Sequence, residues 1–320
     1  MAVYTEVDDA SLRAFLAAYE LGEPVAFRPI LEGVENSNYL LETSVGRFIL
    51  TLYERRVNAV ELPFFLGLLE HLAGRGVPCP TPVHGRDGKT LRSLCGRPAA
   101  LVTFLEGRSL RRREPAHCAS LGVALGHMHI AGLDFDGSRR NALSVRSWRR
   151  LFEPCTARAD EVAPGLRAEI EAELDVLEAG WPHGLPKGVI HADLFPDNVF
   201  FMGDEVSGLI DFYFACNDLI AYDLAICLNA WCFEADGQFN ISKARALLRG
   251  YRSARPFKAE EVEALPLLAR GAALRFLLTR LYDWLYPADG PLVRPKDPLE
   301  YRNRLRFHRL IASPAAYGLD

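Results

Sequence analysis

The stretch Val189-Ile-His-Ala-Asp-Leu-Phe-Pro-Asp-Asn-Val-Phe-Phe201, followed by Leu209-Ile-Asp-Phe-Tyr213, decides the fold of this chain. Its apolar residues come in short runs separated by polar loops, which is typical of strands. A Gly203-Asp204 pair between the last two runs indicates a tight turn. The pattern predicts one strand and then a β-hairpin, at 189–190, 199–201 and 206–210.

Polar side chains punctuate these predicted strands. Asp193 and Asn198 lie in the loop before the hairpin, and Asp211 ends its second strand. Carboxylate and amide oxygens are the ligands that Mg²⁺ prefers when substrate phosphates complete its coordination. The stretch therefore predicts a site for Mg²⁺ and a phosphorylated ligand.

The spacing His-x-Asp-x-x-x-x-Asn matches the catalytic loop of protein kinases, and Asp211 begins a segment placed like their Asp-Phe-Gly. Carried over by position, Asp193 is the base that accepts the proton of the attacking hydroxyl, and Asn198 and Asp211 hold Mg²⁺. His191 is expected to brace the loop. Asp and Asn are also common turn formers, but the combined spacing favours phosphoryl transfer.

Length and composition indicate a cytoplasmic enzyme. The chain has 320 residues, 49% of them hydrophobic, which suggests two lobes with substantial cores. No apolar run approaches the ~20 residues of a membrane span, and the amino terminus does not resemble a signal peptide. The charge balance of 37 − 41 = −4 argues against nucleic acid as a partner. Seven cysteines without a Cys-x-x-Cys pair predict free thiols.

The first part of the chain predicts a small antiparallel sheet with two helices. Strands are expected at 26–30, 38–42, 47–53 and 96–105, and helices at 9–19 and 58–73. The loop between the first two strands can lay its backbone N–H groups on phosphate oxygens, with an ordinary turn as the alternative. The residues expected there are Gly33, Asn36, Ser37 and Asn38. Backbone near Phe104 and Leu105, at the end of the last strand, is expected to bind the purine.

The remainder is mostly helical. Apolar periodicity predicts helices at 115–131, 158–179, 219–234, 240–254 and 259–285. The expected layout is a nucleotide-binding lobe over 1–105 and a catalytic and acceptor-binding lobe over 106–320. The nucleotide would bind between them. The fold class is α+β, with a small β-rich lobe and a larger helical lobe.

With these motifs the chain resembles the small-molecule kinases related to aminoglycoside and choline phosphotransferases, which have a two-lobed protein-kinase-like fold. The most specific stretches are His191-Ala-Asp-Leu-Phe-Pro-Asp-Asn198, Leu209-Ile-Asp-Phe212 and Tyr222-Asp-Leu-Ala225. Within that group it is most similar to the bacterial homoserine kinases, through Gly33-Val-Glu-Asn-Ser-Asn-Tyr39 and Arg280-Leu-Tyr-Asp-Trp-Leu285 among others. The resemblance implies transfer of the γ-phosphoryl group of ATP to L-homoserine, a step toward threonine. Asp223 is expected to support the catalytic loop.

One position departs from the general kinase pattern. The third strand usually carries a lysine that grips the phosphates, and here the residue at that place is Thr51. The phosphate contacts are then expected from the loop backbone near 36–38, from Thr51, or from Arg55 or Arg56. The change also motivates an alternative outside the enzyme class, a nucleotide-binding pseudokinase, although the base and metal positions are intact.

The charges of the expected acceptor predict which residues line its pocket. Homoserine is a zwitterion, and its carboxylate calls for an arginine. We expect one of Arg275 and Arg280 to bind it, with salt bridges as the alternative role, and Tyr213 and Trp231 to border the pocket. A choline or ethanolamine kinase is the alternative within the enzyme class, because Trp231, Trp284 and Tyr286 could form part of an aromatic cage. The oligomeric state is not predicted.

Overall fold

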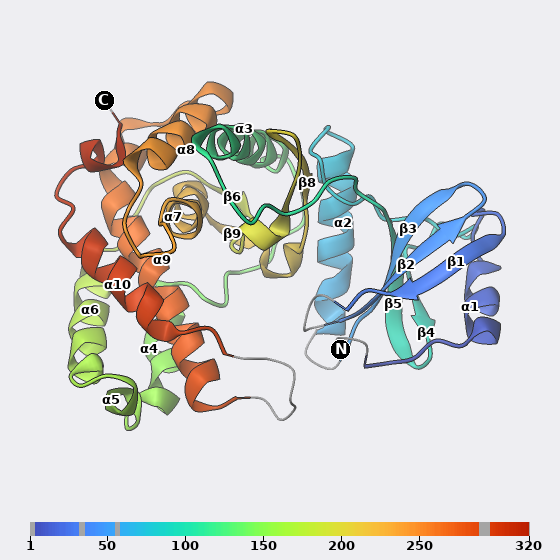
Figure 1. Cartoon of the computed structure of the whole chain (residues 1–320), viewed down its shortest axis with the longest axis horizontal. Helices are drawn as coiled ribbons and strands as arrows, with labels where there is room; N and C mark the ends of the chain where they lie inside the picture. The colour runs from blue at the N-terminus through green and yellow to red at the C-terminus, as the bar shows by residue number, and fades with distance from the viewer. Residues whose placement is uncertain (1–3, 32–35, 55–57, 288–294, 320) are drawn as a thin grey trace. The chain divides into compact units, whose positions relative to one another are not determined.

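The computed structural model describes residues 4–31, 36–54, 58–287 and 295–319. The chain divides into two compact units, Met1–Gly107 and Arg108–Asp320 (Figure 1). The first unit contains a β-sheet with two α-helices, whereas the second is mainly helical.

The first unit is built on a five-stranded antiparallel sheet. Its strand order is β1 (Pro24–Pro29), β2 (Ser37–Thr43), β3 (Gly46–Leu52), β5 (Arg97–Thr103) and β4 (Leu91–Leu94). The four predicted strands are all present, with ends that differ by one or two residues. β4 was not predicted, because four residues are too few to show a period.

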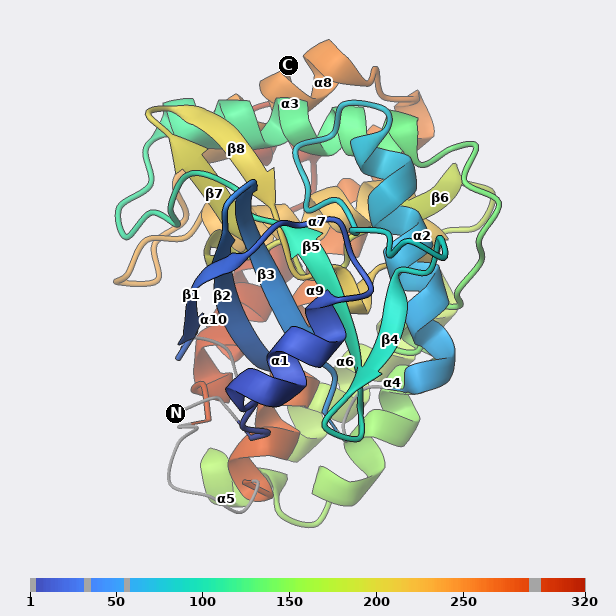
Figure 2. The ribbon, with the colours of Figure 1, turned by 90° about the vertical axis from the view of Figure 1, so that its right-hand side faces the viewer.

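Two helices lie on opposite sides of this sheet (Figures 1 and 2). Helix α1 (Asp9–Leu16) is capped by the Asp8 side chain, and it packs its apolar face on Leu41, Leu50 and other buried sheet residues. The predicted helix at 9–19 is too long, since its last residues form a tight turn. Helix α2 (Leu62–Ala73) lies on the other side. Asn58 caps a 3₁₀ turn before it, η1 (Ala59–Glu61), rather than the helix itself.

The helices of the second unit pack on one another. Five of them are α3 (Pro115–Ala131), α7 (Ile220–Trp231), α8 (Ile241–Ala254), α9 (Ala259–Leu285) and α10 (Pro298–Arg309). Helix α9 packs against both α7 and α10, and α3 packs along α8 (Figure 1).

The predicted helix at 158–179 is wrong as a single element. It is broken into α5 (Ala159–Val162) and α6 (Leu166–Gly180), because Pro164 cannot continue a helix and Gly165 adopts a left-handed φ of 74°. Helix α4 (Val145–Phe152) and α10 were not predicted.

Two small antiparallel sheets carry the stretch from 187 to 219. The predicted hairpin is confirmed as β7 (Val199–Met202) paired with β8 (Glu205–Leu209). The preceding strand, β6 (Lys187–Ile190), pairs instead with β9 (Cys216–Leu219), which was not predicted. Short 3₁₀ turns, η3 (Pro196–Asn198) and η4 (Phe212–Phe214), follow the loop and the hairpin.

Two predictions from composition can be compared with the structure. The seven cysteines are free thiols, as predicted. Across the described ranges, no helix combines the length and apolar composition needed for a transmembrane span.

A buried histidine, His308, hydrogen-bonds both to Tyr317 and to Asn229 on α7. His308 on α10 is 1% exposed. Its Nδ1 lies 2.8 Å from the Tyr317 hydroxyl and its Nε2 lies 3.2 Å from Asn229 Oδ1. The Asn229 amide in turn donates to the Ala269 carbonyl on α9. Burial, with the Arg304 charge nearby, lowers the pKa of His308 to about 3.

This depressed pKa predicts acid sensitivity. Above the unfolded-state pKa of about 6.5 the ring is neutral in both states. As pH falls below 6.5, His308 becomes protonated in the unfolded chain but stays neutral in the native protein. The free energy of unfolding therefore falls by up to about 1.4 kcal/mol per pH unit. Urea titrations between pH 7 and 5 should show this slope reduced in His308→Gln. The exposed His183→Gln is the control, and equal slopes in all three proteins would contradict the account.

Candidate active site

The loop after β6 places two of the predicted site residues side by side. The Asn198 amide Nδ2 donates to the Asp193 carbonyl at 2.8 Å and lies 3.4 Å from Asp193 Oδ2. This bond fixes the amide with its nitrogen toward Asp193, so its oxygen is the end that remains to bind a cation. Asp193 keeps a fifth of its side-chain surface exposed (20%), so a ligand can reach it.

Asp211 is brought to the same place by its neighbour in sequence. The Ile210 N–H donates to the Asn198 carbonyl at 3.0 Å, and the Ile210 carbonyl accepts from His191 Nε2 at 2.9 Å. Asp211 itself is exposed and adopts a left-handed backbone, φ 64° and ψ 59°. Such a conformation is uncommon for residues other than glycine, and residues held in it cluster at active sites. Asp193, Asn198 and Asp211 therefore converge.

The donor chemistry of this cluster fits a hard divalent cation. Asn198 and Asp211 offer only oxygen to a metal, as Mg²⁺ prefers. In the described part of the chain, no group of three or more His, Cys, Asp or Glu side chains could hold a metal ion by itself. An ion on these two residues would thus need further oxygen ligands, such as those of a triphosphate.

A buried carboxylate holds the catalytic loop in shape. Asp223 on α7 is fully buried, and its two oxygens accept the backbone N–H groups of His191 at 2.7 Å and Ala192 at 2.8 Å. Ala192 has a left-handed φ of 64°, so its strain is offset by these bonds. Asp223 also accepts from His129 Nε2 at 3.1 Å, and His129 Nδ1 lies 2.7 Å from the Tyr251 hydroxyl.

The protonation states follow from this geometry. Burial alone raises the pKa of Asp223, but the hydrogen bond and charge of His129 outweigh it and hold that pKa below its usual value. Burial lowers the pKa of His191, so its ring is neutral. The neutral ring donates through Nε2 and accepts the Asp193 N–H at Nδ1, 3.3 Å away. His191 thus bonds to both the loop and the hairpin.

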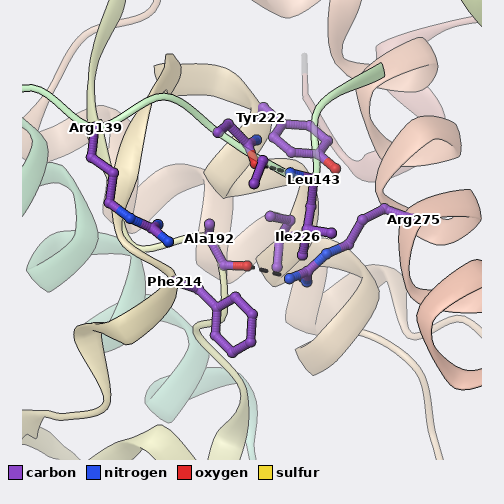
Figure 3. Close-up of a pocket in the computed structure, with 9 residues that line it drawn as sticks. Arg139, Leu143, Ala192, Phe214, Tyr222, Ile226 and Arg275 are labelled. Carbon is purple, nitrogen blue, oxygen red and sulfur yellow. Dashed lines mark hydrogen bonds between the residues drawn. The ribbon is translucent and has the colours of Figure 1, made fainter. Parts of the chain in front are cut away.

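A pocket of about 250 Å³ opens beside the catalytic loop. Ala192 lies in its wall, and Arg139 and Arg275 enter from opposite sides (Figure 3). Arg275 is 3% exposed, and its Nη1 lies 3.3 Å from the Ala192 carbonyl and 3.5 Å from Asp193 Oδ1. Its guanidinium also stacks over Phe276, 3.8 Å from the ring centre. Among the described residues that line this pocket, none is a carboxylate.

The other predicted acceptor residues lie elsewhere. Arg280 forms an ion pair with Glu300 at 2.5 Å and stacks over Tyr301, and it does not line the pocket. Trp231 is fully buried and donates from its indole to the Leu194 carbonyl at 2.8 Å, so it supports the loop from beneath. Tyr213 lies half-buried in η4, next to the pocket residue Phe214.

The residues predicted to bind nucleotide lie in the first unit. Asn38 on β2 faces Thr51 on β3, and the Thr51 hydroxyl lies 2.7 Å from Asn38 Oδ1. Ser37 is fully buried and bonds to Glu54 at 2.7 Å. Asn36 accepts the Glu54 N–H at 3.3 Å.

Two further predicted nucleotide residues follow β5. Phe104 donates its N–H to the Arg47 carbonyl at 3.2 Å, and Leu105 comes directly after it, half-buried. Gly33, Arg55 and Arg56 lie outside the described residues.

Sequence reasoning missed two residues that the structure brings to the site, Arg139 and His129. Arg139 lies in a coil, so no periodicity marks it. It is brought to the pocket by bonds across the second unit, from its N–H to Asn217 Oδ1 at 2.8 Å and from its Nη1 to the Ala215 carbonyl at 3.1 Å. His129 is a buried polar residue on α3, and a histidine within an apolar helix was the available signal.

Comparison with known proteins shows the family to which the chain belongs. A model of the phosphotransferase enzyme family, APH, matches residues 26–257. The chain belongs to this family. A homoserine kinase of Rhodospirillum rubrum, a relative of this phosphotransferase, is 62% identical over 320 residues, 100% of each chain.

Solved structures share the fold of this phosphotransferase. An amicoumacin kinase, hAmiN, in complex with AMP-PNP, Ca²⁺ and Ami has a TM-score of 0.70 at 15% identity, covering 96% of this chain and 95% of that one. A choline kinase of Cryptosporidium parvum has a TM-score of 0.63 at 15% identity, covering 89% and 88%. Such identities show the fold alone, and they confirm the predicted protein-kinase-like class.

The role of Asp223 can be tested by replacing it with asparagine. Asp223→Asn would turn an amide N–H₂ toward backbone donors and leave at least one of them unpaired. We expect a loss of about 2–5 kcal/mol in the free energy of unfolding and a large fall in kcat. The exposed Asp175→Asn, which breaks only a surface pair with Arg149, should change stability by under about 1 kcal/mol. Equal effects of the two substitutions, measured by urea unfolding, would refute the role.

Proposed function

We propose that this phosphotransferase is a homoserine kinase, which transfers the γ-phosphoryl group of ATP to the side-chain hydroxyl of L-homoserine on the way to threonine. The observation that carries the proposal is the 62% identity to a homoserine kinase over the whole length of both chains. The geometry agrees, because the pocket beside Asp193 presents two guanidinium groups suited to an amino-acid carboxylate.

The reaction is proposed as a direct transfer. Asp193 orients the homoserine hydroxyl and accepts its proton as the oxygen attacks the γ-phosphorus, and ADP leaves on the opposite side. Asn198 and Asp211 are proposed to hold Mg²⁺, which would neutralise charge on the triphosphate. Positioning and charge stabilisation supply most of the catalysis in such reactions.

The remaining site residues have supporting roles in the proposal. Arg275, beside both Ala192 and Asp193, is assigned to the acceptor carboxylate, whereas Arg280 is occupied by Glu300. In the first unit, the hydrogen-bonded pair of Asn38 and Thr51 is proposed to contact phosphate in place of the usual lysine.

The pocket disfavours the choline alternative. A quaternary ammonium needs aromatic faces and no competing cations, yet two arginines line this pocket. Of the proposed cage residues, Trp231 is fully buried, and the Tyr286 ring is already covered by Arg158, 5.3 Å from its centre. ADP release measured in parallel with L-homoserine, choline, ethanolamine, hydroxylysine and an aminoglycoside tests the choice. No signal with homoserine above the ATP-only blank, with a signal from another acceptor, would overturn it.

The base assignment gives a sharper prediction. Asp193→Asn should bind nucleotide normally and lose between about 10²- and 10⁴-fold in kcat, the usual contribution of a general base. Asp197→Asn is the matched control, since it lies in the same loop but is exposed (71%), and among the described residues its ion-pair partner is Lys296 at 3.9 Å. Near-normal turnover by Asp193→Asn in a coupled ADP assay would remove the assignment.

A further inference from the structure

A line of buried polar side chains leads away from the catalytic loop, and the proposed reaction does not use its far end. It begins at Asp223, which accepts from His129 Nε2 at 3.1 Å, and His129 Nδ1 lies 2.7 Å from the Tyr251 hydroxyl. Both His129 and Tyr251 are fully buried. Burial raises the pKa of Tyr251 well above its usual range, so the phenol keeps its proton at neutral pH.

The line continues to an ion pair at the corner between α8 and α9. Arg255 Nη1 donates to the Tyr251 hydroxyl at 3.2 Å and to one Glu261 oxygen at 3.0 Å, and Arg255 Nη2 donates to the other at 3.2 Å. The buried Glu261 side chain also accepts the N–H of Lys258, the residue before α9, at 3.0 Å. Direct hydrogen bonds therefore join the α8–α9 corner to Asp223.

Close helix packing brings the His129 and Tyr251 side chains together. Helix α3 packs along α8 (Figure 1), and glycines at the contact let one backbone approach the other. A Cβ atom at Gly250 on α8 would lie 2.1 Å from a carbonyl oxygen of α3, and one at Gly122 on α3 would lie 2.2 Å from a carbonyl oxygen of α8. No larger residue fits at such distances without a backbone shift, so the pairing of His129 with Tyr251 is set by the helix packing.

We propose that Tyr251 and Arg255 are positioning residues for phosphoryl transfer. They act on the catalytic loop through His129 and Asp223, so the inference rests on the proposed function, in which that loop carries the base. The same oxygen of Asp223, Oδ2, accepts both His129 Nε2 and the backbone N–H of His191. The orientation of the His129 ring therefore acts on the atom that holds the loop, and neighbouring bonds in such a chain strengthen one another.

A second buried pair of the same kind provides a matched control. His308 Nδ1 lies 2.8 Å from the Tyr317 hydroxyl, and both side chains are buried as deeply as the first pair. On its other side His308 Nε2 lies 3.2 Å from Asn229 Oδ1. Tyr251→Phe and Tyr317→Phe thus remove the same group from the same kind of partner, but the first interrupts the line to Asp223 and the second does not.

The test combines steady-state kinetics, with ATP and L-homoserine, and hydrogen exchange of the loop. Tyr251→Phe should lower kcat at least roughly fivefold, as expected when a buried polar group loses its partner. Both KM values should stay unchanged, because the loop positions the base rather than the bound substrates. The amide hydrogens of His191 and Ala192 should exchange faster than in the wild type. Tyr317→Phe should reduce stability in urea to a similar degree and keep the wild-type kcat and loop exchange.

Arg255→Met tests the far end of the line. Alone it should lower kcat, and in the Tyr251→Phe background it should lower kcat no further, because it acts through Tyr251. Additive effects of the two substitutions, or a kcat and loop exchange in Tyr251→Phe equal to those of Tyr317→Phe, would overturn the proposal. If Tyr251→Phe does not fold, an unchanged kcat in Arg255→Met overturns it instead. If the wild-type enzyme leaves L-homoserine unphosphorylated, the proposed function fails, and the loop exchange still decides the positioning role.

Discussion

The site depends on one buried carboxylate and the two backbone N–H groups that it accepts. Asp223 holds His191 and Ala192 at 2.7 and 2.8 Å, and these bonds keep the loop in a conformation that Ala192 would otherwise avoid. A charged acceptor makes such bonds stronger than neutral ones. The buried carboxylate also accepts a hydrogen bond from His129, which sequence reasoning did not consider.

The hydrogen bonds of Asp223 determine the positions of the other site residues. The left-handed backbone of Ala192 orients the next residue, Asp193, and the Asn198 amide donates to the Asp193 carbonyl. His191 and Asn198 then fix Ile210, which places Asp211. Each step is a backbone hydrogen bond or a bond to backbone, so the arrangement belongs to the fold and does not require a ligand to form it. Preorganisation of this kind is what phosphoryl transfer asks of a protein.

The site residues that lie close together in the sequence were predicted, whereas those brought together from distant parts of the chain were missed. Asp193, Asn198 and Asp211 lie within one strand-loop-hairpin unit, so their spacing alone indicated that they meet. Arg139 gave no such signal, because its place depends on Asn217 far along the chain. The helix predicted over 158–179 ignored the break at Pro164 and Gly165, where the chain adopts a left-handed turn. The roles of the arginines on α9 could be distinguished only once their ion-pair partners were known.

The central claim is that Asp193 meets the acceptor hydroxyl while Asn198 and Asp211 meet the metal on the triphosphate. A crystal structure of the full chain with Mg²⁺, a non-hydrolysable ATP analogue and L-homoserine tests it most directly. The account predicts the homoserine hydroxyl within about 3 Å of an Asp193 oxygen, with Mg²⁺ bound by Asn198 and Asp211. A hydroxyl directed away from Asp193, or a metal held by other side chains, would contradict it.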